Sequence, residues 1–81
     1  MSQTIVTAGE FMSMPGRFYY TLMVNNRRVS CGKDCGSGGP EAAAAKAVEL
    51  AINYGGEYLI LGPAKVMRHI PESIRSGMIS A

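Results

Sequence analysis

The chain has 81 residues, the size of one compact domain, and 47% of them are apolar, as in ordinary globular proteins. Its formal net charge of +2 is too small to indicate nucleic-acid binding by itself. The sequence contains no apolar run long enough for a transmembrane helix, and residues 1–4 do not begin like a signal peptide. We therefore expect one domain, residues 1–81, located in the cytoplasm.

Three segments in the first half of the chain predict an antiparallel meander. Residues 4–8 are rich in β-branched side chains and indicate a first strand. Residues 17–24 indicate a second strand, with alternating apolar side chains at Phe18, Tyr20, Leu22 and Val24. The other face of this strand carries Tyr19, Thr21 and Met23, which predicts a central or half-covered position. The asparagines at 25–26 suit a tight hairpin turn, and residues 27–31 form the predicted return strand.

Residues 40–54 form the clearest predicted element, a helix that follows a glycine-rich loop. Pro40 suits the first helical position, where no backbone N–H donor is needed, and Glu41 meets the positive end of the helix dipole. The glycines at 55–56 can supply a left-handed stop. An apolar stripe at helical spacing consists of Ala44, Ala47, Val48 and Ala51. Because these side chains are small, we expect the helix to approach the sheet closely.

The last third of the chain is less regular. Residues 58–61 indicate a short buried strand, whereas residues 66–70 fit both strand alternation and helical spacing, and we favour a final strand. Residues 71–75 fit one helical turn beginning at Pro71. The expected fold is therefore α+β: an antiparallel sheet of four or five strands with one alanine-rich helix packed on it, in the order β-β-β-α-β-β.

The sequence does not indicate a catalytic or metal site. Catalysis needs convergent groups such as a nucleophile beside a base, but His69 is the only histidine and the six carboxylates form no spaced pair. Cys31 and Cys35 are too few thiols for a zinc site, and we expect both to be reduced. We predict that the protein is not an enzyme and uses no metal, cofactor or small-molecule substrate.

Four residues are candidate partner contacts, because methionine and arginine are enriched at protein interfaces. Met12 and Met14 lie in the predicted loop before the second strand, and Arg27 and Arg28 lie at the tip of the predicted hairpin. Each pair also has a simpler interpretation. The methionines would serve core packing, and the arginines would keep the hairpin tip solvated.

Four pieces of the second half occur in a specific order: Glu-Ala-Ala-Ala-Ala-Lys-Ala at 41–47, Tyr-Leu-Ile-Leu-Gly at 58–62, Lys-Val at 65–66 and Ile-Pro-Glu at 70–72. An alanine-rich helix alone would not be specific. The ordered combination resembles a small phage-encoded anti-CRISPR family directed at type I-F CRISPR-Cas systems. The resemblance covers about half the chain, while the first half agrees only in its pattern of strands and turns.

This resemblance implies a non-catalytic inhibitor in the cytoplasm of the bacterial host. Such an inhibitor binds the RNA-guided surveillance complex, near its large subunit, and blocks recruitment of the helicase-nuclease. Contact with nucleic acid would occur only through that complex. The sequence departs from the family at residues 11–14 and in the loop from Cys31 to Cys35, which leaves the CRISPR subtype and the contact surface open. The family has no motif that transfers contact residues to this chain.

Two alternatives belong to other functional classes. Strands followed by a helix after a glycine-rich loop resemble part of a double-stranded-RNA-binding domain, but the helix begins with Pro40, Glu41 and Ala42 rather than with phosphate-binding lysines. A phage structural or assembly protein is the third possibility, and ordered homo-oligomers would identify it.

Overall fold

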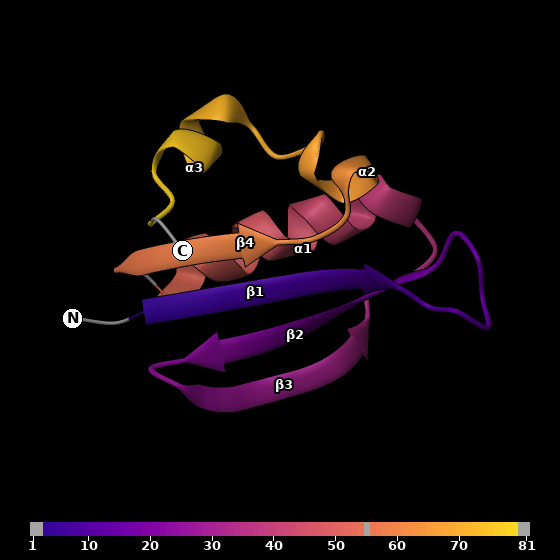
Figure 1. Ribbon diagram of the computed structural model, residues 1–81, viewed down its shortest axis with the longest axis horizontal. Helices are drawn as coiled ribbons and strands as arrows, with labels where there is room; N and C mark the ends of the chain where they lie inside the picture. The colour runs from indigo at the N-terminus through magenta and orange to yellow at the C-terminus, as the bar shows by residue number, and fades with distance from the viewer. Residues whose placement is uncertain (1–2, 55, 80–81) are drawn as a thin grey trace.

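The computed structural model of the protein describes residues 3–54 and 56–79. Its elements are, in chain order, β1 (Gln3–Glu10), β2 (Phe18–Val24), β3 (Arg27–Asp34), α1 (Gly39–Tyr54), β4 (Glu57–Leu61), α2 (Ala64–Met67) and α3 (Glu72–Ser76). Figure 1 shows α1 running along the sheet, with α2 and α3 beyond β4 and with β3 at the far edge. The predicted α+β class is confirmed.

The predicted meander is confirmed, but the sheet is mixed rather than wholly antiparallel. Its strand order is β3-β2-β1-β4, with antiparallel β1–β2 and β2–β3 pairs and a parallel β1–β4 pair. The crossover helix explains the parallel pair. The 16 residues of α1 span about 24 Å, which is close to the length of an eight-residue strand. The helix therefore returns the chain to the end of the sheet where β1 begins, and β4 starts beside it.

The β2–β3 turn follows the prediction from the two asparagines. Asn25 and Asn26 have positive φ angles of 53° and 66°, which is the conformation of a two-residue hairpin turn with the twist of its strands. The Asn25 N–H donates to the Gln3 carbonyl at 2.8 Å, and the Gln3 N–H donates to Asn25 Oδ1 at 2.9 Å. The turn is thus joined to the start of β1.

The predicted fifth strand is wrong, because residues 64–67 form the short helix α2. The N–H groups of Met67 and Arg68 donate to the carbonyls of Pro63 and Ala64 at 3.0 Å each. Helical spacing places Val66 and Ile70 in the core, where they are 0% and 2% exposed. The predicted turn after Pro71 is confirmed as α3, and the Tyr58 hydroxyl on β4 donates to the Ile74 carbonyl at 2.8 Å.

Helix α1 begins one residue before the predicted start and buries the expected alanines. Ala44, Ala47 and Ala51 are at most 1% exposed, and Ala43 is buried beside them. They pack with apolar residues of three strands, namely Val6, Ala8, Phe18, Leu22 and Ile60. Gly56 has a φ of +69° after the helix, whereas Gly55, the other half of the predicted stop, lies outside the described residues. Small side chains therefore set a short distance between helix and sheet.

We expect Ala47→Leu to lower the free energy of unfolding by about 1–3 kcal/mol, because the fully buried Ala47 faces the sheet with no room for a larger side chain. Urea denaturation measures the loss. Ala45→Leu is the matched control on an exposed position of the same helix, and it should change stability by less than about 0.5 kcal/mol. Equal losses in both variants would contradict close packing at Ala47.

Candidate functional site

The sheet has one face covered by helices and one face that the helices leave uncovered. Along β1, Thr4, Val6 and Ala8 are buried in the core together with residues of α1 and α2. Side chains alternate between the two faces of a strand, so Ile5 and Thr7 lie on the opposite face, where Thr7 is exposed. Within the described residues, this second face therefore borders solvent rather than helices.

Strand register shows which side chains share this face. One row runs from Leu59 through Ile5 to Met23, and the next runs from Leu61 through Thr7 to Thr21. We call this set, together with Tyr19, the open face: Ile5, Thr7, Tyr19, Thr21, Met23, Leu59 and Leu61. A solvated sheet face is usually polar, whereas the centre of this one carries only threonine hydroxyls and one phenol as side-chain polar groups. Its charged and amide side chains lie at the borders, where Gln3 pairs with Glu57 and Asp34 pairs with Tyr19. The exposed set includes Leu61, with 43% of its surface accessible.

The structure separates the two arginines that the sequence grouped together. Arg28 pairs with Met23, so its side chain extends the first row of the open face. Arg27 pairs with Val24, which packs against the core on the helix side, so Arg27 belongs to that side of the sheet. Both arginines are exposed, and neither forms an ion pair with another described residue.

The loop of residues 11–17 lies at the other end of the sheet. Figure 1 places it at the end of β1, opposite the β2–β3 turn that carries the arginines. Met12 is 99% exposed and Met14 is 43% exposed, as a contact role requires. Phe11 is instead half-buried, with its ring 5.2 Å from that of Tyr19. The two predicted contact pairs are therefore not together, but the open face lies between them.

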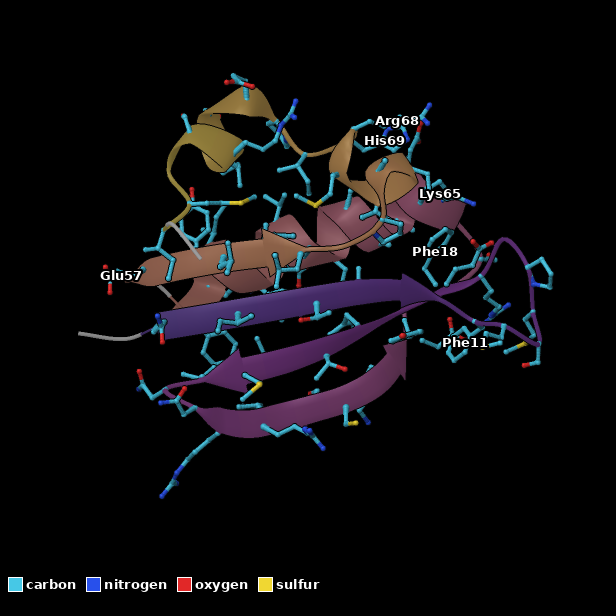
Figure 2. All side chains as sticks on the ribbon, in the orientation of Figure 1. Phe11, Phe18, Glu57, Lys65, Arg68 and His69 are labelled. Atoms are coloured by element: carbon cyan, nitrogen blue, oxygen red, sulfur yellow. The ribbon has the colours of Figure 1, made fainter. Side chains whose placement is uncertain are left out.

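Two carboxylates fix the base of this loop. Glu10 accepts hydrogen bonds from the Gly16 N–H at 2.7 Å and from Lys65 Nζ at 3.0 Å. Figure 2 shows Lys65 on the α2 side of this end of the sheet and Phe11 on the loop side. The Gly16 N–H and then the Lys65 ammonium lower the pKa of Glu10 below its usual value. Lys65 is thus engaged in holding the loop in place.

Asp34 does the same from the end of β3. It accepts the Gly36 N–H at 2.8 Å, and Arg17 Nε and Nη2 both reach Asp34 Oδ2 at 2.9 Å. The Gly36 N–H, followed by the Arg17 guanidinium, lowers the pKa of Asp34. Because Arg17 ends the loop and Asp34 lies opposite Tyr19, this contact ties the loop to the border of the open face.

Strand β3 is an edge strand whose shape disfavours pairing with another strand. Its register with β2 shifts between the Tyr20 and Leu22 pairs and again between the Leu22 and Met23 pairs. Gly32 has a φ of +62°, and its N–H donates to Thr21 Oγ1 at 3.2 Å. Such bulges twist an edge and reduce its ability to pair with another strand. A partner is therefore better accommodated on the open face than along this edge.

The remaining candidate groups are the two thiols and the possible metal ligands. No group of three or more histidine, cysteine, aspartate or glutamate residues in this part of the chain could hold a metal ion. Cys31 and Cys35 are free thiols, and burial, followed by the nearby Asp34 charge, raises the pKa of Cys35. A raised pKa keeps that thiol protonated at neutral pH. None of the described helices is both long and apolar enough to cross a membrane.

The open face went unrecognised in the sequence, although β2 carried a signal for it. Tyr19, Thr21 and Met23 alternate with the buried residues of β2. An internal strand with apolar residues on both faces needs cover on both, and the helices of residues 3–54 and 56–79 form a layer on one face only. The contributions of Leu59 and Leu61 depend on β4 lying next to β1, which no local pattern reveals.

We expect acid to loosen the loop of residues 11–17. The pKa values of Glu10 and Asp34 are both lowered in the fold. The stabilisation that the two carboxylates provide is therefore complete above their ordinary pKa values of about 4.3 and 3.9. It is lost as the pH falls through the lowered pKa values of the folded protein. Amide exchange of loop residues as a function of pH, corrected for the intrinsic rate, measures this loosening. Glu10→Gln and Asp34→Asn should each remove part of the acid dependence. An unchanged profile in both variants would contradict the assignment.

Comparison with known proteins adds no family assignment to this geometry. No protein-family model matches the chain, and no curated protein matches it significantly.

Proposed function

We propose that the protein is an anti-CRISPR inhibitor that binds a type I surveillance complex through the open face and sterically blocks helicase-nuclease recruitment. The observation that carries the binding role is a sheet face with an apolar centre that no described helix covers, bordered by Arg28 at one end and by Met12 and Met14 at the other. The resemblance of residues 41–72 to anti-CRISPR proteins directed at type I-F systems supplies the identity of the partner.

The composition of this surface suits binding to a protein. Aromatic residues, methionine and arginine are enriched at interfaces, and apolar contacts dominate their centres. A stable interface needs about 800 Å² on each partner, which a small domain can supply from one face. Burying the open face would also remove apolar surface from water, at about 25 cal/mol per Å². Steric inhibition requires only such a contact and no catalytic group.

The charges favour a protein subunit, with the large subunit as the proposed target, over mimicry of nucleic acid. A mimic would present many carboxylates to the basic channels of the complex. Here the net charge is +2, and Arg27, Arg28 and Lys33 are exposed cations on β3 without ion pairs to described residues. Direct binding of RNA is also not favoured at the start of α1, where Glu41 is exposed.

The test uses purified type I-F surveillance complex, with and without target DNA, and measures both binding of this protein and recruitment of the helicase-nuclease. We expect binding accompanied by loss of recruitment. No binding in either state would refute type I-F inhibition. RNA affinity that falls steeply with salt would support the nucleic-acid-binding alternative, and ordered homo-oligomers without binding would support an assembly role.

Two pairs of variants test the contact surface. Thr7→Arg puts a bulky charge at the exposed centre of the open face and should weaken binding by at least about tenfold, as at the centre of other interfaces. Its control is Ile52→Arg, at an exposed position of α1 on the other layer, which should bind like the wild type. Arg28→Glu should weaken binding more than Arg27→Glu, because only Arg28 shares the open face. Full binding by Thr7→Arg would exclude the open face as the contact.

A further inference from the structure

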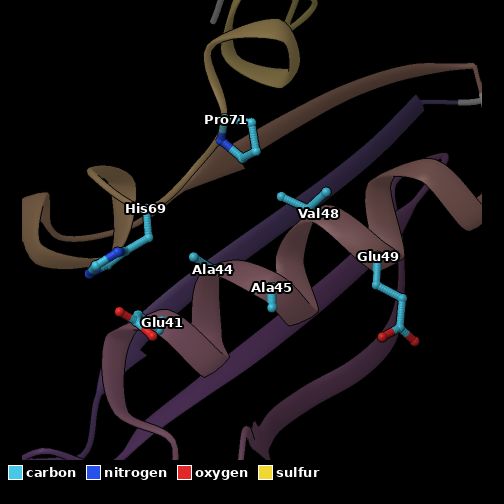
Figure 3. A pocket seen from close by; sticks show the side chains of 7 residues that line it. All are labelled: Glu41, Ala44, Ala45, Val48, Glu49, His69 and Pro71. Carbon is cyan, nitrogen blue, oxygen red and sulfur yellow. The ribbon is translucent and has the colours of Figure 1, made fainter.

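A groove of about 520 Å³ lies on the helical side of the molecule, between α1 and the turn that joins α2 to α3. Figure 3 shows α1 forming one wall, with His69 and Pro71 forming the other. The residues that line it are Glu41, Ala44, Ala45, Val48, Glu49, His69 and Pro71. None of them belongs to the open face, so the groove is a separate surface.

The floor of the groove is apolar and its border is acidic. Ala44, Ala45 and Val48 supply the floor from successive positions of α1, and Pro71 faces them. The alanine side chains are too short to fill the space between the helix and the turn, which leaves the groove open. Such a floor suits the methylene groups of a long side chain, which remain in contact with apolar surface while the charged head stays near water.

The negative charge at one end of the groove has no internal counter-ion. Glu41 is exposed and forms no ion pair with another described residue. Glu49, at the other end, meets Lys46 at 3.5 Å, and both side chains of that pair are well exposed. Lys65 on α2 is bonded to Glu10, and Arg68, beside His69, forms no ion pair with Glu41 within the described residues. A cationic group of another molecule could therefore pair with the Glu41 carboxylate without displacing a buried ion pair.

We propose that this groove binds an arginine side chain from an extended or helical segment of a partner protein. The arginine methylenes pack on Ala45, Val48 and Pro71, and the guanidinium pairs with the Glu41 carboxylate beside the His69 ring. Arginine fits better than lysine because its planar guanidinium can form two hydrogen bonds to a carboxylate and stack on a ring. Nucleic acid is disfavoured, because Glu41 and Glu49 repel phosphate. The inference does not depend on the proposed anti-CRISPR function.

The test is a titration of ¹⁵N-labelled protein with the acetylated, amidated peptide Ala-Leu-Ala-Arg-Ala-Leu-Ala, followed by amide chemical shifts. We expect saturable shifts at residues 41–49 and 69–72. The matched peptide with glutamine in place of arginine should bind about two- to fivefold more weakly, the range for a solvent-exposed ion pair. Equal affinity for the two peptides would overturn the proposal. So would shifts confined to the open face, and so would no shifts at all.

Three variants complete the test. Glu41→Gln should reduce affinity for the arginine peptide to that for the glutamine peptide, whereas Glu72→Gln removes an exposed carboxylate outside the groove and should have no effect. Ala45→Leu fills the floor from an exposed helical position and should abolish binding while the spectrum stays that of the folded protein. Wild-type affinity in Ala45→Leu would overturn the proposal. Groove shifts that depend on protein concentration without peptide would assign the groove to a second copy of the chain instead.

Discussion

The close packing of α1 on the sheet is the constraint on which the rest of the structure depends. Alanines at 43, 44, 47 and 51 bring the helix backbone near β1, β2 and β4, so one helix can cover most of a four-stranded sheet. The helix is about as long as the strands, and the crossover therefore places β4 parallel to β1. The following segments also pack on this helical side, so no described helix covers the other face of the sheet.

Cross-strand pairing then determines which residues can act together. Adjacent residues of a strand point to opposite faces, so the register of β3 with β2 places Arg28 on the open face and Arg27 on the helical side. At the other end, Glu10 and Asp34 hold the loop that presents Met12 and Met14, through hydrogen bonds to backbone N–H groups and to cationic side chains. The border of the open face is thus built from ordered contacts, which would lower the entropic cost of the proposed binding.

Local signals in the sequence were enough for the meander, the Asn25–Asn26 turn and the long helix, because each depends on neighbouring residues. The error at residues 66–70 arose because Val66 and Ile70 fit either a strand or a helix, and contact with α1 decides between them. The parallel position of β4 and the groove between α1 and Pro71 both require knowledge of which distant segments meet. The exposure of Met12 and Met14 could be predicted from the sequence. The placement of Arg27 and Arg28 on opposite faces of the sheet could be seen only from the pairing of β2 with β3.

A domain of 81 residues gains less free energy of folding from the burial of apolar surface than a larger domain does. The free protein gains none from the apolar side chains of the open face that stay in water. Binding of the proposed partners would recover that contribution on the open face, and the groove on the other layer would add a contact of opposite charge. Arg28 and Glu41 would then meet different surfaces of their partners. Charge complementarity mainly fixes orientation and selects partners, whereas apolar burial provides most of the affinity. An inhibitor that acts by obstruction needs both, because it must be held in the one orientation that blocks access.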